Sequence, residues 1–166
     1  MTVGVHQAVS VRPTGFERLL ASLTAVLLLA VVAAVVRGRA EWQTIPALIW
    51  LHLATIILAL ALTPVLLLRP RGVRRHRQLG YLWVASMTLT AALSFGIRTI
   101  NPGGLSAIHI LSAITLVSAP LVAWRAHNHQ VIAHRFTVQI LITGALIVAG
   151  FFTFPFARLL GRWLFG

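Results

Sequence analysis

Cysteine and lysine are absent from this chain of 166 residues, and its only acidic residues are Glu17 and Glu41. Without cysteine the chain cannot form disulfides, thiolate metal sites, iron–sulfur clusters or covalently attached c-type haem. The two carboxylates are expected on opposite sides of a membrane, which excludes the paired acids of glycosidases and proteases. No general base, nucleophile or substrate pocket can be read from the sequence, so an enzyme activity would be at most redox chemistry.

The chain is instead rich in long runs of apolar residues. Its residues are 58% hydrophobic and 10% charged, whereas about a quarter of the residues in a soluble domain are charged. Five apolar runs are long enough to cross a hydrocarbon core of ~30 Å as helices. We therefore predict an all-α integral membrane protein with a tail (1–18), one transmembrane domain (19–154) and an interfacial segment (155–166). The predicted spans are 19–36, 45–68, 79–97, 105–124 and 136–154.

All fourteen basic residues are arginines, and they give the chain a formal net charge of +12. They stand at the ends of the apolar runs, where arginines orient helices and meet anionic lipid head groups. Nucleic-acid binding is not predicted, because no basic face carries interleaved aromatic residues. Nine arginines fall on the side of the N-terminus and five on the other. The positive-inside rule then places the N-terminus in the cytoplasm and the C-terminus in the periplasm of a bacterial inner membrane.

The five spans differ in their polar content. The first contains only Ser22 and Thr24 as polar residues, which suits a lipid-facing anchor, so spans two to five are predicted to form an antiparallel four-helix core. In the third span, Ser86, Thr90 and Ser94 make a hydroxyl stripe that favours close helix contacts. Trp83, near the start of that span, is predicted to lie at the membrane interface.

Four histidines recur at matched spacings. His52 and His76 are 24 residues apart, and His109 and His134 are 25 apart. In an antiparallel bundle this predicts that His52 meets His109 near the outer face and that His76 meets His134 near the inner face. Paired imidazoles suit the axial ligation of one or two b-type haems. Arg98 is the candidate propionate partner outside, and Arg77 or Arg135, with Arg74 and Arg75, inside.

Each histidine also has a simpler interpretation. His52 and His109 could form helix–helix hydrogen bonds to hydroxyl or carbonyl groups, and His76 and His134 could be solvated residues at helix starts. His127 and His129 could bind a surface metal ion or belong to a polar turn. The matched hairpins could also result from a duplication that serves packing alone.

Several short motifs stand out from His76 onward. They are His76-Arg-Gln-Leu-Gly-Tyr-Leu-Trp-Val, Ser94-Phe-Gly-Ile, Ile108-His-Ile-Leu-Ser-Ala-Ile-Thr-Leu, His134-Arg and Ala149-Gly-Phe-Phe-Thr-Phe-Pro. With these motifs the sequence resembles a bacterial family of predicted multi-span membrane proteins of unknown function. The resemblance covers residues 48–166, and it departs from the family at Pro155-Phe-Ala-Arg158, where a proline–glycine–arginine turn is expected. The layout of histidines on four core spans is similar to that of two-haem transmembrane b-type cytochromes, including the ascorbate-reducible ones.

The function predicted from these features is membrane electron transfer by a cytochrome b-like protein that binds haem through His52, His109, His76 and His134. The partners expected are the lipid bilayer and a redox partner or larger membrane complex. An alternative is a cofactor-free accessory subunit that packs against such a complex. A further alternative is histidine-bound copper or zinc at the outer face.

Overall fold

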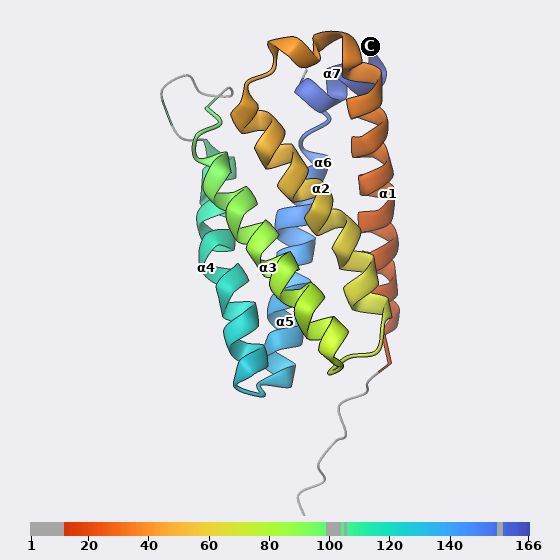
Figure 1. Ribbon diagram of the computed structural model, residues 1–166, viewed down its shortest axis with the longest axis vertical. Helices are drawn as coiled ribbons and strands as arrows, with labels where there is room; N and C mark the ends of the chain where they lie inside the picture. Colours follow the sequence, from red (N-terminus) through yellow and green to blue (C-terminus); the bar gives the residue numbers. More distant parts are fainter. Residues whose placement is uncertain (1–11, 99–103, 105, 156–157) are drawn as a thin grey trace, which may run out of the picture.

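The computed structural model describes residues 12–98, 104, 106–155 and 158–166, and it contains only helices and connecting turns in these ranges. The described part of the chain has five long helices. They stand side by side (Figure 1). The helices are α1 (Gly15–Arg37), α2 (Ala47–Leu68), α3 (Arg74–Ser94), α4 (Ala107–His127) and the continuous α5 (Val131–Leu141), η2 (Ile142–Val148) and α6 (Ala149–Phe151). A 3₁₀ helix, η1 (Gly38–Thr44), follows α1, and α7 (Leu159–Phe165) ends the chain.

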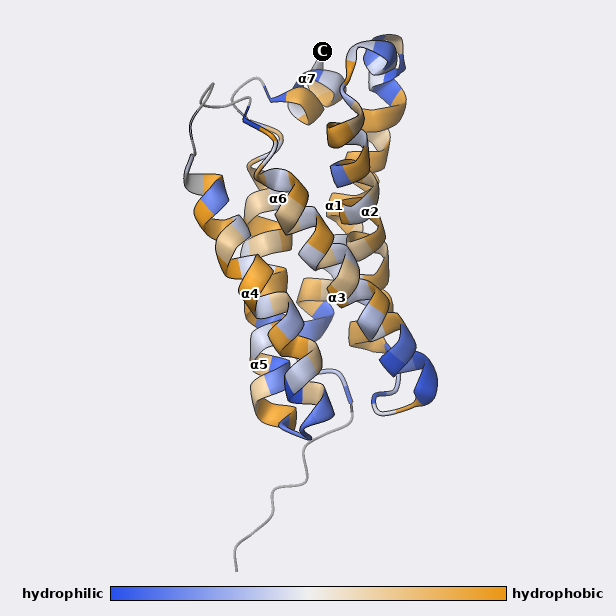
Figure 2. Cartoon of the chain, turned by 60° about the vertical axis from the view of Figure 1, so that its left-hand side comes forward, coloured by the Kyte–Doolittle hydropathy of each residue, from blue (hydrophilic) through white to orange (hydrophobic). Residues whose placement is uncertain are grey.

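Four helical segments within the described residues are long and apolar enough to cross a membrane: Gly15–Thr44, Ala47–Leu68, Ile108–His127 and Val131–Phe151. The fifth long helix, α3, begins with a run of arginines and carries the hydroxyl stripe, so it is less apolar. The prediction of an all-α membrane protein is therefore confirmed at the level of four packed candidate spans. Figure 2 shows the apolar residues along the middle of the helices and the hydrophilic ones toward their ends.

Three of the helices, α1, α3 and α5, begin earlier than the predicted spans. Thr14 Oγ1 accepts a hydrogen bond from the Glu17 backbone N–H at 3.3 Å, and Glu17 Oε2 accepts one from the Thr14 N–H at 2.8 Å. This capping box starts α1 at Gly15, inside the predicted tail. Similarly, α3 starts at Arg74 and α5 at Val131, because arginine and histidine are acceptable residues in a first helical turn outside the lipid.

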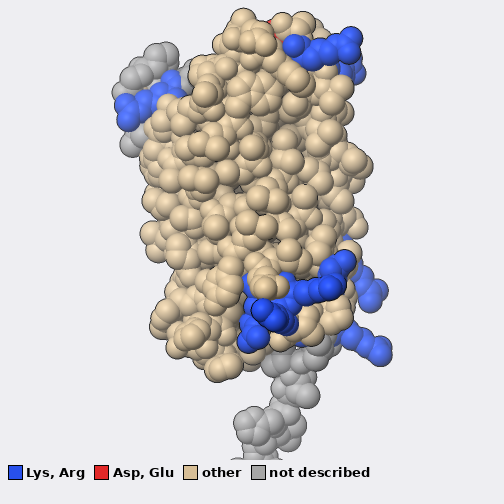
Figure 3. Space-filling view, viewed as in Figure 1, with Lys and Arg blue, Asp and Glu red and all other residues tan. Residues whose placement is uncertain are grey.

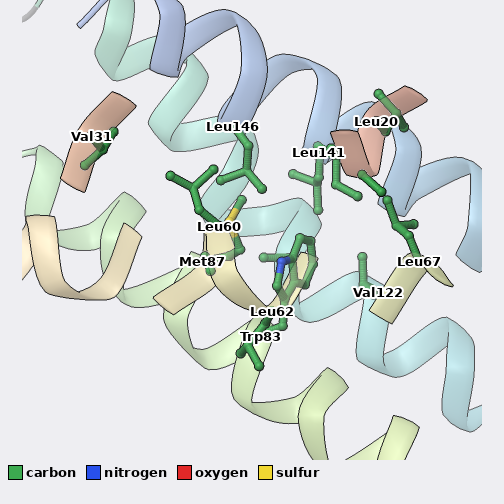
Figure 4. Packing of buried hydrophobic residues seen from close by; sticks show 14 of the residues in the cluster. Leu20, Val31, Leu60, Leu62, Leu67, Trp83, Met87, Val122, Leu141 and Leu146 are labelled. Atoms are coloured by element: carbon green, nitrogen blue, oxygen red, sulfur yellow. The ribbon is translucent and has the colours of Figure 1, made fainter. Parts of the chain in front are cut away.

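The first helix belongs to the core. It packs against α2 on one side and η2 on the other, and its Leu20, Ala21 and Val31 are buried in the hydrophobic cluster. A core made of spans two to five alone is thus not what the structure shows. Figure 4 shows Leu60, Met87 and Leu146 from α2, α3 and η2 meeting in the same cluster.

Polar and apolar residues are distributed in the reverse of the soluble pattern. Ten polar or charged residues are buried among those described, whereas many large aliphatic and aromatic side chains face outward, such as Leu29 at 70% and Val117 at 71% exposure. A soluble protein would not expose an apolar surface of this extent. Figure 3 shows arginines gathered at the two ends of the molecule with an uncharged band between them. The bundle therefore matches a lipid environment.

Buried hydroxyl groups connect neighbouring helices. The Thr90 hydroxyl of α3 donates to Thr55 of α2 at 2.8 Å, and the Ser94 hydroxyl donates to Ser112 of α4 at 2.5 Å. The predicted stripe is thus a helix–helix contact on both sides of α3. Trp83 is 3% exposed and donates to Thr63 Oγ1 at 2.9 Å. The Trp83 side chain therefore faces the inside of the bundle and not the lipid, and its depth relative to the membrane interface stays a prediction.

The two ends of the bundle differ in charge and in the segments that form them. The start of α1, the α2–α3 turn and the α4–α5 turn lie together at one end, which we call the basic end (Figure 1). The opposite end, which holds η1 and α7, is called the α7 end.

Candidate functional site

A cavity of about 790 Å³ lies among the helices in the half of the bundle near the α7 end. Its size is within the ~300–1,000 Å³ of typical small-molecule sites. Most of its wall is aliphatic, with contributions from α1, α2, α3, α4, η2, α6 and α7. The polar residues that line it are His52, Thr90, Ser94, Ser112, Thr115, Thr153, Arg158 and Arg162. We call it the central cavity.

His52 is the predicted site residue that the structure places on this cavity. Its Nδ1 lies 3.1 Å from the backbone carbonyl oxygen of Thr90 on α3. A carbonyl oxygen only accepts hydrogen bonds, so Nδ1 must carry the ring proton when the imidazole is neutral. Nε2 then keeps its lone pair. Histidines that bind metals usually have this arrangement, with the second nitrogen donating to a carbonyl.

His109 has a different role. It is 3% exposed and does not line the central cavity. Its Nδ1 accepts a hydrogen bond from the Ser106 backbone N–H at 2.9 Å as part of a capping box at the start of α4. Its ring lies 5.7 Å from that of Phe95, measured between centroids. In the neutral ring, Nε2 must therefore carry the proton, and this buried atom has no hydrogen-bond partner among the described residues.

The two remaining predicted ligands lie at the basic end. His134 on α5 has Nδ1 at 3.0 Å from the Val122 carbonyl oxygen of α4, and the Nδ1 of His76 on α3 is buried without a hydrogen-bond partner in the described part of the chain. Burial lowers the pKa of His76, and the neighbouring His134 and Arg71 lower it further. Whether His76 and His134 pair as ligands of one iron stays a prediction.

The predicted propionate partners do not line the central cavity. Arg98 is exposed and donates from Nε to the Phe95 carbonyl at 3.4 Å. Arg77 is exposed in the first turn of α3. Arg135 is bound to Glu17, with Nη2 at 3.0 Å from Oε1. The arginines that reach the cavity are Arg158 and Arg162, near the end of the chain.

Glu17 is a residue that the sequence did not single out. Its side chain is 2% exposed, and Arg71 approaches its Oε2 to 2.6 Å while Arg135 approaches Oε1 to 3.0 Å. Gln139 donates to Oε1 at 3.5 Å. One signal was available in the sequence: a single acidic residue among the nine arginines predicted on its side of the membrane has many possible partners.

No group of three or more histidine, aspartate or glutamate side chains that could hold a metal ion occurs among the described residues. His127 and His129 are exposed on the α4–α5 turn, and His6 falls outside the described part of the chain. A haem with one or two histidine ligands requires no such group, so the haem prediction is not decided by this observation.

These features define a class of protein: a helical membrane bundle with a largely apolar internal cavity and a histidine on its wall. Comparison with known proteins adds no closer identity. No family model matches the chain. No curated protein matches it, and no solved structure does.

Proposed function

We propose that this protein is a cytochrome b-like electron-transfer protein of a bacterial inner membrane, with haem b held in the central cavity by His52. The observation that carries the proposal is the His52 ring itself: it lines the cavity, and its Nδ1 is occupied by the Thr90 carbonyl. Nε2 is thereby the ring atom available to iron.

Two further features of the cavity suit a haem. Its wall is mainly aliphatic, which excludes water from a macrocycle and affects its potential. Arg158 and Arg162 line the same cavity, and guanidinium groups bind carboxylates such as propionates well. When bound, haem b would supply one-electron transfer between its ferric and ferrous states. The chain's own residues would bind it, orient it and exclude water.

The sequence predicted a second axial ligand, His109, and a second haem between His76 and His134. His109 fits less well than His52, because its Nδ1 is used by the helix cap and its Nε2 carries the proton. We therefore propose one haem in the central cavity. Bis-histidine ligation and a second haem remain predictions from the sequence.

The proposal includes α3 as a fifth span in an antiparallel bundle, with the basic end in the cytoplasm. The lower hydropathy of α3 comes largely from its first-turn arginines and from Ser86, Thr90 and Ser94, which are buried against other helices. Residues buried in protein need not be apolar for a helix to cross the bilayer. Membership of the bacterial family of predicted multi-span membrane proteins is part of the same proposal, on the motifs that begin at His76, Ser94, Ile108, His134 and Ala149.

The test is an absorbance spectrum of the detergent-solubilised protein before and after dithionite. We expect a Soret band and a reduced α band, both lost in His52→Ala and both kept in His127→Ala. The control residue is the last of α4, is exposed at the basic end and does not line the cavity. His109→Ala would change the spectrum if His109 were the second axial ligand.

Two results would contradict the proposal. The first is wild-type protein that remains colourless after expression with added haem precursor, and the second is an unchanged spectrum in His52→Ala. A colourless preparation that co-purifies with stoichiometric partners would favour the accessory-subunit alternative. Copper or zinc without haem absorbance would favour a histidine metal site.

A further inference from the structure

A second, smaller cavity lies at the basic end, between the end of α2 and the beginning of α3. Its volume is about 340 Å³. Three of its lining residues carry or can carry positive charge: Arg69, Arg75 and His76. The other lining residues are Val65, Leu66, Pro70, Val73 and Leu79. We call it the basic cavity.

No carboxylate lines the basic cavity among the described residues. The chain has two acids in all. Glu17 is engaged by Arg71 and Arg135, and Glu41 lies at the α7 end, 3.5 Å from Arg162. The positive charge of Arg69 and Arg75 is therefore not matched by a carboxylate of this protein. An anion from outside the chain is the natural counter-charge.

A buried polar atom in this region also lacks a partner. The Nδ1 of His76, whose side chain lines the basic cavity, is buried without a hydrogen bond to any described residue. Such an atom is costly in an apolar environment unless a ligand satisfies it. Neighbouring Arg71 has the same property at Nη1. Arg71 does not line the cavity, whereas Arg69, Arg75 and His76 do and can offer several hydrogen-bond donors to one multivalent acceptor.

The apolar part of the wall indicates the kind of anion. Val65 and Leu66 belong to α2 and Leu79 to α3. Val73, between them, is 49% exposed, and Leu68 beside the cavity is 50% exposed. A free inorganic ion would not use these surfaces, whereas the upper part of an acyl chain would. Arginines near the end of an apolar helix lie at the depth of lipid phosphates.

From these observations we infer that the basic cavity is a binding site for the head group of an anionic phospholipid. Its phosphate would lie between the guanidinium groups of Arg69 and Arg75, which bind phosphate oxygens through paired N–H donors. His76 would donate one further hydrogen bond to a phosphate oxygen, and Val65, Leu66 and Leu79 would contact the acyl chain. This site is independent of the haem proposal.

The experiment measures lipid binding to the full chain in detergent by native mass spectrometry, with phosphatidylglycerol and phosphatidylcholine as probes. We expect selective retention of phosphatidylglycerol by the wild type. In the double variant Arg69→Gln/Arg75→Gln its apparent affinity should fall about tenfold or more, given the value of each surface arginine for anionic lipid. The matched control is Arg37→Gln/Arg39→Gln, which removes two exposed arginines at the α7 end.

The other possible outcomes of this experiment also test the inference. Equal losses in the two double variants would mean non-specific charge attraction and would overturn the inference. If millimolar inorganic phosphate displaced phosphatidylglycerol as effectively as added lipid does, the cavity would be a free-phosphate site. That result would overturn the assignment to lipid. If the double variant is misfolded by circular dichroism, the single variants Arg69→Gln and His76→Gln must each weaken phosphatidylglycerol binding. Unchanged binding in both would refute the site.

Discussion

Thr63 and Trp83 show how a single buried hydrogen bond matters in a bundle with little internal water. The indole N–H of Trp83 donates to Thr63 Oγ1 at 2.9 Å, and the Thr63 hydroxyl donates to the Ala59 carbonyl at 2.7 Å. Thr63 is 1% exposed. An indole N–H left without an acceptor at this depth would pay its full desolvation cost.

At the residue scale we predict that Thr63→Val destabilises the protein by about 1–3 kcal/mol, the usual cost of an unsatisfied buried donor. The substitution keeps the shape of the side chain and removes the acceptor. Unfolding in mixed detergent micelles, followed by tryptophan fluorescence, measures the change.

The matched control for this prediction is Thr88→Val, on α3. The Thr88 hydroxyl is buried and has no hydrogen-bond partner among the described residues, so its replacement by a methyl group should be neutral or stabilising. Equal losses from the two substitutions would show that the Trp83–Thr63 hydrogen bond contributes nothing specific.

The histidines show the limit of residue-level prediction. His76 and His134 lie near one another at the basic end, and His52 lines the central cavity without His109, the partner predicted for it. The sequence could not show that His109 would cap its own helix, because a histidine three residues after a serine is equally compatible with a core position. Which nitrogen carries the proton depends on the atoms that surround the ring.

At the scale of elements, Glu17, the one acidic residue of α1, links this helix to other parts of the bundle. Arg71 and Arg135 come from positions 54 and 118 residues away from Glu17. They lie in the α2–α3 turn and in α5. The buried carboxylate therefore joins three separate parts of the chain. A helix predicted to be a peripheral anchor is held at its first turn by charge and along its length by core leucines and alanines.

We predict that Glu17→Gln destabilises the protein by about 2–3 kcal/mol. This is below the full cost of breaking a buried ion pair, because the two arginines remain 19% and 18% exposed. Glutamine can still complete the capping box with Thr14, so the substitution isolates the charge. The free energy of unfolding in mixed micelles is the measurement.

Glu41→Gln is the control for Glu17→Gln. Glu41 and Arg162 are 51% and 56% exposed at a separation of 3.5 Å, and an exposed ion pair contributes about 0–1 kcal/mol. We expect a change within the error of the measurement. If Glu17→Gln were as harmless as Glu41→Gln, the ion pairs at the basic end would not hold α1.

At the scale of the whole molecule, the arrangement is a ring of five helices with the central cavity inside it. Each helix packs against its neighbour in sequence, and α1 closes the ring against η2. At the α7 end, α7 packs on α1 and η1. A Cβ on Gly38 would overlap the Trp163 ring, and one on Gly161 would overlap the Phe154 backbone. Glycine at both positions lets α7 sit closely over the cavity.

The proposed five-span topology can be tested by cysteine labelling, because the chain has no cysteine of its own. We expect a membrane-impermeant maleimide to label Arg39→Cys and Gly166→Cys in intact spheroplasts, and to label Gln130→Cys only after lysis. These positions are exposed at the α7 end, at the C-terminus and on the α4–α5 turn. If α3 did not cross the membrane, Gln130→Cys would be labelled in intact spheroplasts and Gly166→Cys would be protected.

Much of the fold could be predicted from the sequence. Apolar run length determines that the chain is helical and suited to a bilayer, since no other arrangement of such runs satisfies the backbone in lipid. The positions of the arginines determine where the helices end. The boundaries were less accurate, because a helix can extend past the lipid into charged residues, as α3 does at Arg74 and α5 at Val131.

The tertiary structure decided which face of each helix points inward. The helices α2 and α4 are apolar nearly all round, so no periodicity in the sequence distinguishes their buried faces from their lipid-facing ones. The rotation of each helix about its axis results from many small packing contacts and a few hydrogen bonds, such as those of Thr90 and Ser94. That rotation put His52 on the cavity and Glu17 between two arginines. The sequence alone determined the kind of protein, through the hydrophobic effect acting along each run, and packing between the runs determined its sites.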